Sequence, residues 1–275
     1  MEHETLVRLS WFGGVFAFMA LWELAAPRRP RNVSKTRRWV SNIGVLMLGT
    51  TAVRLLFGAA AVGTALYAQD RGWGLFGELD WPYGLELALT VVLLDLTVYM
   101  QHVMFHAVPL FWRLHMMHHA DLDLDVTSGT RFHPVEYVLS MGIKMAMVAL
   151  LGPPVAAVVV FEVLLNGTSM FNHANIYMPA WLDRILRLFI VTPDMHRVHH
   201  SVDSAESNSN FGFNVPWWDR LLGTYRAQPA KGHEDMTLGL TQFLDKRRQA
   251  LWWLLLMPFT ERQGSYAINR RRFGD

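Results

Sequence analysis

Cysteine is absent from the sequence, and charged residues are scarce. The lack of thiols excludes disulfides, thiolate zinc sites, iron–sulfur clusters and cysteine nucleophiles within the chain. Asp, Glu, Lys and Arg make up 17% of the residues, whereas about 25% is usual in soluble proteins. A net charge of only +2 argues against a protein that binds nucleic acid. The sequence also has no H-E-x-x-H motif, which excludes the common membrane metalloprotease site.

Hydrophobic residues make up 52% of the 275 residues, with sixteen Phe and eleven Trp, a composition typical of membrane proteins. They form four apolar blocks, at about 5–26, 39–68, 82–106 and 135–172. The first three blocks are long enough to supply the roughly 20 helical residues that cross a bilayer core. The fourth block is interrupted at its centre by Pro153 and Pro154. Because proline breaks helices, this block is predicted to form a hairpin of two helices that enters the membrane and returns.

The N-terminus, MEHETLVRLSWFGG, lacks the basic start of a cleavable signal peptide, so its apolar block is expected to remain as an anchor. Basic residues are concentrated in two runs, 27–39 and 269–273. By the positive-inside rule, the loop 27–38 with its six basic residues is expected to be cytoplasmic. The loop 69–80 then lies outside, and the third block returns to the cytoplasmic face. The hairpin brings His173 back to that face, so every clustered histidine shares one side of the membrane.

Beyond about residue 176 the sequence is more polar and its apolar pieces are short. The Trp-rich pieces at 215–225 and 251–259 cannot span a bilayer, so they are expected to lie at the interface or to cover the site. The segment 201–210, SVDSAESNSN, is the most polar stretch and the first candidate for mobility.

Histidine is concentrated in three clusters with the spacing of metal ligands, HVMFH, HMMHH and HRVHH, and FNHAN adds one more candidate. Positions i, i+3 and i+4 of a helix share one face, so each cluster is predicted to direct its imidazoles into a common space. The candidate metal ligands are His102, His106, His115, His118, His119, His173, His196, His199 and His200.

Nine imidazoles cannot be buried together without partners, because each leaves a polar nitrogen to satisfy. Metal ions meet that need, and imidazole is a good ligand for iron, zinc, copper and nickel. Nine ligands exceed the coordination number of one such ion. Two metal ions are therefore the economical hypothesis, in place of incidental surface or core histidines.

An acidic residue, Asp95, interrupts the apolar third block and begins a helical stripe. Tyr99 and the two histidines of the HVMFH cluster follow it at spacings of 4, 3 and 4 residues. An ionisable side chain is costly in lipid and is therefore a candidate for function. Asp95 and Tyr99 are predicted to act in catalysis, one of them by a hydrogen bond to the distal nitrogen of a ligating histidine. The alternative is a packing role in which Asp95 pairs with Arg54 or Lys144.

Two proline-containing motifs predict helix starts next to histidines. TPDMHRVHH places Thr192 as N-cap and Pro193 in the first turn, so the third histidine cluster is expected on a rigid helix. In RFHPVE, His133 precedes Pro134. His133 is a tenth ligand, an outer hydrogen-bond donor or the N-terminal cap of the hairpin, and the sequence leaves these open.

The order of the clusters resembles that of the fatty acid hydroxylase/sterol desaturase superfamily of integral-membrane di-iron enzymes. Its members carry H-x(3–4)-H, H-x(2–3)-H-H and a second H-x(2–3)-H-H, and all three boxes occur here in that order. RFHPVE, FNHAN and NVPWWDRLLGTYR also look like the family's connecting segments, so the resemblance covers about 90–226. Stearoyl-CoA-type desaturases are less similar, because their boxes are spaced more widely and have different flanks.

The resemblance implies a non-haem di-iron oxygenase that uses O2 as co-substrate to hydroxylate, or desaturate, an unactivated C–H bond of a lipid. Its nine histidines would bind two iron ions, and the lipid would enter from the bilayer. The chain has no fused cytochrome b5 domain and no cysteine for an iron–sulfur cluster. Electrons are therefore expected from a separate donor of the ferredoxin or cytochrome b5 type, which the basic patches could dock. The identity of the lipid stays open.

The predicted fold is all-α: a multi-pass membrane helical bundle with a helical cap on the cytoplasmic face that carries a histidine-rich di-metal site. Three regions are expected, namely N-terminal transmembrane helices with a basic loop at 1–81, a catalytic domain at 82–226, and an interfacial or cytoplasmic tail at 227–275. The alternative function is a membrane haem- or metal-binding carrier without oxygenase activity, and a further alternative is a structural zinc protein. Histidines clustered at one membrane edge favour the oxygenase, because the ligands of a carrier would line a pore.

Overall fold

The computed structural model describes residues 2–79, 81–264 and 266–268, and within these ranges the regular structure is helical. There, β structure is limited to two isolated bridges. The all-α prediction is therefore confirmed. The basic run 269–273 lies outside the described residues.

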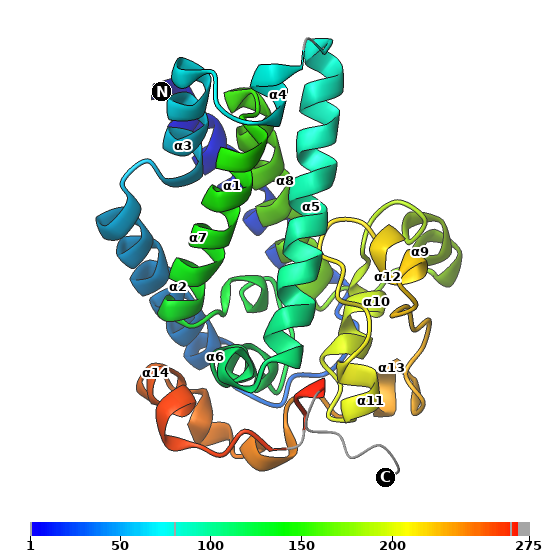
Figure 1. Cartoon of the computed structure of the whole chain (residues 1–275). Helices are drawn as coiled ribbons and strands as arrows, with labels where there is room; N and C mark the ends of the chain where they lie inside the picture. The colour runs from blue at the N-terminus through cyan, green and yellow to red at the C-terminus, as the bar shows by residue number, and fades with distance from the viewer. Residues whose placement is uncertain (1, 80, 265, 269–275) are drawn as a thin grey trace.

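Five segments are helical, long and apolar enough to cross a membrane, which marks the chain as an integral membrane protein. They comprise α1 (Glu2–Ala25), α2 (Lys35–Phe57) with α3 (Ala60–Arg71) and α4 (Leu75–Glu78), α5 (Tyr83–Ala107), α7 (Pro134–Leu151) and α8 (Val155–His173). In Figure 1 they form the long helices of the upper bundle, and the N-terminus lies at its upper end.

The second apolar block is bent where a single helix was expected. α2 ends at Phe57 and α3 begins at Ala60, with positive φ angles of 59° at Gly58 and 47° at Ala60. A positive φ is incompatible with a continuous right-handed helix and is most easily adopted by glycine. The two helices and α4 still form one candidate span, which carries the chain to the end of the bundle opposite the loop before α2.

The hairpin predicted for the fourth block is confirmed. Gly152, between α7 and α8, has a φ of 61°, and a side chain there would clash with the backbone of Trp73. Pro154, with φ of −54° and ψ of 133°, occupies the N-cap position of α8. α8 then returns beside α5 and brings His173 to the end of the bundle where α5 also finishes (Figure 1).

The remaining helices are short and surround the lower half of the bundle (Figure 1). They are α6 (Pro109–His119), α9 (Ala180–Leu186), α10 (Pro193–His199), α11 (Ser204–Ser207), α12 (Trp217–Leu221), α13 (Gly232–Asp235) and α14 (Leu251–Thr260), with 3-10 turns at 128–130, 241–243 and 246–249. The apolar α14 buries Leu254 against Trp112 of α6 and Val45 of α2. The bundle therefore carries the predicted helical cap, and the C-terminal region is part of it.

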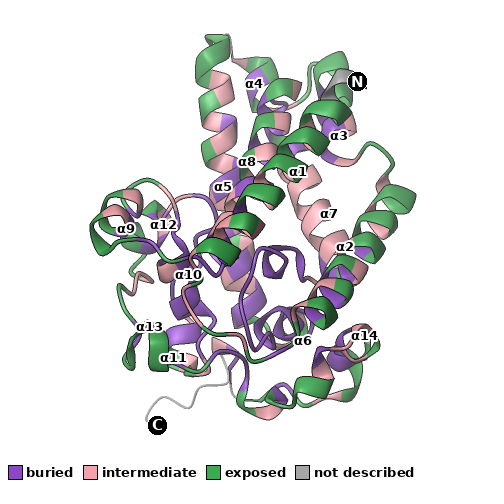
Figure 2. Ribbon diagram, turned by 180° about the vertical axis from the view of Figure 1, so that it is seen from behind, coloured by how far each residue is buried: buried purple, intermediate pink, exposed green. Residues whose placement is uncertain are grey.

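Burial differs sharply between the bundle and the cap. Figure 2 shows buried residues concentrated around α6 and α10, whereas α1 and α2 are largely exposed. Only 6% of the spanning window of α1 is buried, and Leu55 on α2 is 81% exposed. Apolar side chains that face outward on long helices are suited to a lipid environment, in which the backbone must satisfy its own hydrogen bonds.

A buried ion network connects the first turn of α2, and the loop before it, to the loop after α6. Arg38 has no exposed side-chain surface and pairs with Asp121 at 2.8 Å and with Asp125. Asp123 accepts a hydrogen bond from the backbone N–H of Val33 at 2.7 Å. Buried charges persist only when they are paired. The network therefore fixes the chain directly after the second histidine cluster.

The basic loop is consequently part of the packing of the cap as well as a topology signal. Arg28 pairs with Glu234 at 2.9 Å, and Arg29 donates to the carbonyl oxygen of Met236 at 2.6 Å. Together with Arg38, three of the six basic residues of 27–38 therefore have partners inside the protein.

Candidate metal centre

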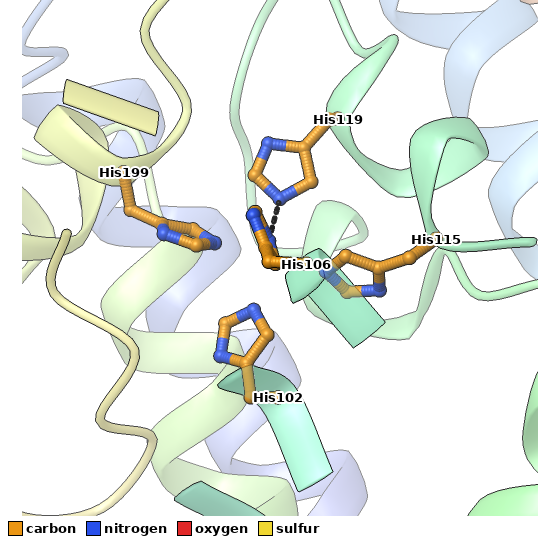
Figure 3. Close-up of side chains that lie close together, drawn as sticks. All are labelled: His102, His106, His115, His119 and His199. Atoms are coloured by element: carbon orange, nitrogen blue, oxygen red, sulfur yellow. Dashed lines mark hydrogen bonds between the residues drawn. The ribbon is translucent and has the colours of Figure 1, made fainter. Parts of the chain in front are cut away.

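The predicted histidines converge at the capped end of the bundle in two groups. The first group takes His102 and His106 from α5, His115 and His119 from α6, and His199 from α10. One ring nitrogen of each lies within 4.8 Å of the others. Figure 3 shows the rings of His102, His115, His119 and His199 arranged around that of His106, which is seen nearly edge-on.

The second group combines His118 of α6, His173 of α8, His196 in the middle of α10, and His200, which directly follows α10 as its C-cap. Their ring nitrogens also lie within 4.8 Å of one another. All nine residues of the two groups are at most 3% exposed. The predicted convergence of distant histidines is confirmed, while their role as metal ligands stays a prediction.

Each H-x-x-H-H box divides its histidines between the two groups, whereas each cluster was expected to fill one space. His119 and His199 belong to the first group, and their neighbours His118 and His200 belong to the second. Consecutive residues point about 100° apart around a helix of 3.6 residues per turn. One turn of α6 and one turn of α10 therefore serve both groups, and the ring centroids of His119 and His200 lie 4.7 Å apart.

Backbone carbonyl groups orient two rings of the first group. Nδ1 of His102 donates to the carbonyl oxygen of Phe211 at 2.8 Å, and Nδ1 of His199 donates to that of Ser209 at 2.7 Å. A carbonyl oxygen can only accept, so Nδ1 carries the hydrogen and Nε2 keeps its lone pair. The Nε2 atoms of His102, His115 and His199 are buried without a hydrogen-bond partner. Such unsatisfied atoms are costly unless a ligand occupies them.

The second group contains a contact that a hydrogen bond cannot explain. Nδ1 of His118 donates to the carbonyl oxygen of Arg131 at 3.3 Å, and Nδ1 of His173 donates to that of Ser169 at 2.8 Å. Both Nε2 atoms therefore present lone pairs, and they face each other at 3.2 Å. Two lone pairs repel unless a cation lies between them. Nitrogens bound at about 2.1 Å to one ion lie about 3.0–3.4 Å apart at coordination angles of roughly 90–109°, so the donor set fits a metal ion.

One histidine of the first group is held by a carboxylate. Nδ1 of His115 donates to Glu136 Oε1 at 2.7 Å, and Glu136 lies in the first turn of α7. His106 has a neutral partner instead, Asn208 Oδ1, at 3.0 Å. Partners of this kind fix the ring and raise the basicity of the ligating nitrogen, and a charged acceptor does so more strongly than an amide.

Burial also keeps the histidines of the cap in the form that binds metal. Desolvation, reinforced by neighbouring histidines, lowers the pKa of His118 and His119 well below the usual value. Desolvation lowers the pKa of His115 to about 3. These side chains are therefore neutral at pH 7, and a neutral imidazole has the lone pair that a metal ion needs.

Asp95 and Tyr99 lie on the predicted stripe, but the expected hydrogen bond to a histidine is wrong. Asp95 Oδ2 accepts from Trp218 Nε1 at 2.7 Å, and the Tyr99 hydroxyl bonds with Thr224 at 2.8 Å. The alternative ion pair of Asp95 is wrong as well, since Lys144 pairs with Glu162 at 2.9 Å and no described basic residue pairs with Asp95. The stripe instead joins α5 to the segment around α12.

The two predicted helix starts are present. Thr192 caps α10, because its hydroxyl accepts from the N–H of Met195 at 3.3 Å. His133 is the N-cap of α7, and its Nδ1 accepts from the N–H of Val135 at 3.2 Å. Neither histidine group includes His133. The possibility left open by the sequence is thus resolved in favour of the cap.

The polar segment 201–210 packs into the site, which corrects the expectation of a mobile loop. Ser207 and Asn210 have no exposed surface, and Asn208 and Ser209 supply partners of His106 and His199. Sequence reasoning missed these contacts because a carbonyl oxygen carries no residue signature. The only sequence signal for these contacts was the run of Ser and Asn residues directly after the third histidine cluster.

Two phenylalanines, also missed, contact both groups. The ring of Phe213 lies 5.2 Å from His102 of the first group and 5.9 Å from His196 of the second. The ring of Phe132 stacks on His118 at 4.4 Å and lies 6.4 Å from Phe213. These two side chains therefore form an apolar wall shared by the two groups.

Comparison with known proteins adds a family and several relatives. A family model described as fatty acid hydroxylase matches residues 87–224, about half of the chain and the whole range of the histidine boxes. Ornithine lipid hydroxylase OlsE of Rhizobium tropici is 29% identical over 96% of this chain and 80% of that protein. No solved structure gives a significant match.

Other relatives match about half of the chain. Alkylglycerol monooxygenase of Xenopus tropicalis is 28% identical over 56% of this chain, and the match covers 33% of that protein. Cholesterol 25-hydroxylase of Homo sapiens is 28% identical over 51% of this chain and 51% of that protein. The family model, by its printed range, covers all nine histidines of the two groups.

Proposed function

Because this chain belongs to the fatty acid hydroxylase family, we propose that it is a membrane lipid hydroxylase that binds two non-haem iron ions and uses O2 as co-substrate. The single observation that best supports bound metal is the pair of Nε2 lone pairs on His118 and His173, which face each other at 3.2 Å. The names of the relatives, which are hydroxylases or monooxygenases of ornithine lipid, alkylglycerol and cholesterol, favour hydroxylation over desaturation.

The protein's own contribution is to hold the ligands, exclude water and place the lipid. The first group would hold one iron ion and the second group the other, and rings such as those of His102 and His173 are fixed from the Nδ1 side. Bound iron would supply the activation of O2 that an unactivated C–H bond requires. Exposure of at most 3% keeps bulk water away from all nine histidines.

The lipid is proposed to reach the reacting position over the wall formed by Phe132 and Phe213. This wall touches both groups, and Phe132 also packs against Tyr137 of the spanning helix α7 at 6.0 Å. A hydrocarbon chain that enters between membrane helices would meet these apolar rings before it meets a histidine. Asp95 and Tyr99 are then proposed to act indirectly, by positioning the segment that contains Phe213.

Hydroxylation consumes one O2, two electrons and two protons for each C–H bond converted, and releases one water. With no cysteine in the chain, the electrons are proposed to come from a separate ferredoxin or cytochrome b5-type donor. The histidine end is proposed to face the cytoplasm, where such donors occur. Arg37 and the other basic residues near that end support this orientation by the positive-inside rule.

The function is tested by lipid mass spectrometry of cells that express the chain, grown under 18O2. The expected result is a lipid that gains one labelled oxygen atom, together with two irons per purified chain and no haem absorption band. The matched control is His133→Asn, which keeps a capping side chain outside both groups and should keep iron and product. A lipid profile identical to that of cells without the chain would overturn the proposal, and bound haem would favour the carrier.

A further inference from the structure

A second apolar surface lies outside the five candidate spans, on and beside α9 and α12. These helices have 7 and 5 residues, far fewer than a bilayer crossing needs. Six large apolar side chains of this surface are 46–74% exposed, namely Trp181, Leu188, Phe189, Trp217, Leu221 and Leu222. Contiguous exposed apolar side chains on a folded protein mark contact with a partner or a membrane.

A hydrogen bond fixes the depth of this surface along the bundle. Trp218 of α12 donates to Asp95 at 2.7 Å, and Asp95 is the middle residue of the 25-residue α5. At 1.5 Å per residue, α5 is about 37 Å long and Asp95 lies about 18 Å from either end. A hydrocarbon core about 30 Å thick, placed anywhere within that length, includes Asp95. The start of α12 therefore lies at the depth of the hydrocarbon.

α9 is held at the same depth as α12. Trp217 Nε1 donates to the carbonyl oxygen of Leu188 at 2.8 Å, and Arg220 donates to that of Arg187 at 3.2 Å. Figures 1 and 2, seen from opposite sides, both show α9 and α12 beside the middle of α5. The two helices therefore form one lateral lobe attached to the spanning bundle.

The charges of the lobe distinguish a bilayer from a second copy of the chain. Arg184 and Arg220 are exposed, whereas the acids Asp183 and Asp219 are buried, at 8% and 0% exposure. Two copies that met through this surface would bring arginine towards arginine. Anionic lipid headgroups would instead pair with both arginines, while the apolar side chains enter the acyl chains.

We propose that α9 and α12 form a lobe that inserts into the histidine-side half of the bilayer without spanning it. The lobe is connected directly to the metal centre. Asp219 of α12 accepts from the N–H groups of Phe211 at 2.7 Å and Gly212 at 2.9 Å, and the carbonyl oxygen of Phe211 holds His102. The proposed lipid-contacting helix α12 is thus linked through the hydrogen-bonded segment at Phe211 and Gly212 to His102, a candidate metal ligand.

The absence of cysteine makes the test direct, because a single introduced thiol can carry a nitroxide label without other substitutions. Leu221→Cys and Phe189→Cys report on the lobe, since these side chains are 74% and 63% exposed. Leu55→Cys on α2 is the lipid-facing reference, and Arg247→Cys in an exposed 3-10 turn is the polar reference. Each labelled chain is reconstituted into phosphatidylcholine vesicles that contain phosphatidylglycerol.

The measurement compares collisions of each label with O2, which partitions into lipid, and with a nickel chelate, which stays in water. Labels at positions 189 and 221 are expected to match the label at position 55, with frequent O2 and rare nickel collisions. If the labels at positions 189 and 221 collide with the nickel chelate as often as the label at position 247 does, the proposed insertion of the lobe is overturned. Rare collisions with both reagents, together with dipolar broadening between labels, would show a second copy on this surface and also overturn it. None of these readouts depends on iron or turnover, so they fail or succeed independently of the proposed hydroxylation.

Discussion

The two histidine groups use the same ligand type but differ in what supports them. The first has five members and the second has four. In the first, His115 rests on the carboxylate of Glu136 at 2.7 Å. In the second, His118 and His173 rest on backbone carbonyls, and no described carboxylate supports any member.

This difference teaches that identical side chains can build two unequal candidate metal sites. A carboxylate behind an imidazole increases electron donation to a bound ion and stabilises its higher charge state. A carbonyl orients the ring with much less charge. The ion of the first group is therefore expected to bind more tightly and to be harder to reduce than the ion of the second.

The largest effect is expected from removal of one ligand in either group. His118→Ala takes one of the four members of the second group, and His199→Ala takes one of the five members of the first. Each should lower lipid hydroxylation by more than about 100-fold, because loss of an outer partner alone costs about 10–100-fold. Iron per chain should fall further in His118→Ala, whose group has no spare member. Elemental analysis and product mass spectrometry measure both, and full activity in either variant contradicts the di-metal site.

A smaller and more selective effect is expected from Glu136→Gln. The amide keeps an acceptor for His115 but removes the charge, so metal affinity should fall about 10–100-fold in the first group only. Cobalt titration, read by absorption, should show one site weakened and the other unchanged. The matched variant Asn208→Asp adds a charge behind His106 and should strengthen the same site. If both variants leave the two cobalt sites as in the parent chain, the inequality between the groups is refuted.

Acid is expected to act on the two groups alike. In each group, burial lowers the pKa of three imidazoles of the cap below the ordinary 6.5. They are His115, His119 and His199 in the first group, and His118, His196 and His200 in the second. Below pH 6.5 the unfolded chain binds protons that the folded chain does not. The contribution of these six histidines to the stability of the metal-free protein should therefore be constant above about pH 6.5 and fall progressively below it. Melting temperatures of the chelator-treated protein measure this, and a flat profile well below pH 6.5 would contradict it.

The smallest effect is expected from Thr192→Ala, which removes the cap of α10 and costs about 1 kcal/mol. Because α10 supplies both groups, neither should lose metal selectively. A melting temperature about 2–4 °C lower is expected for a chain of this size. Thr192→Ser keeps the hydroxyl and should restore most of the loss. Preferential loss of one metal in Thr192→Ala would show that α10 does not support the groups equally.

The features that were predictable from the sequence have local signals. Pro153 and Pro154 mark the hairpin, and Thr192 with Pro193 marks the start of α10, because caps and prolines act on their own backbone. The histidine boxes predicted that their imidazoles converge, because buried imidazoles in separate places would each leave a polar nitrogen without a partner. The bend near Gly58 was missed, since apolar residues continue on both sides of it.

The features that could not be predicted depend on distant partners. Trp218 lies 123 residues from Asp95, and helical spacing around Asp95 says nothing about an indole on another element. The carbonyls of Phe211 and Ser209 hold histidines through backbone that any residue would supply. Division of each box between two groups depends on how α6 and α10 face each other. Iron, the electron donor and the cytoplasmic orientation stay predictions.

The placement of the third histidine box has a consequence for biosynthesis. Every candidate span is complete by residue 173, but His196, His199 and His200 belong to the last element of the centre to be translated. Since a chain emerges from the ribosome N-terminus first, the bundle can insert before either group has its full set of nitrogens. If the two groups bind iron as proposed, metal delivery is expected to follow membrane insertion, from the side of the membrane where α10 folds.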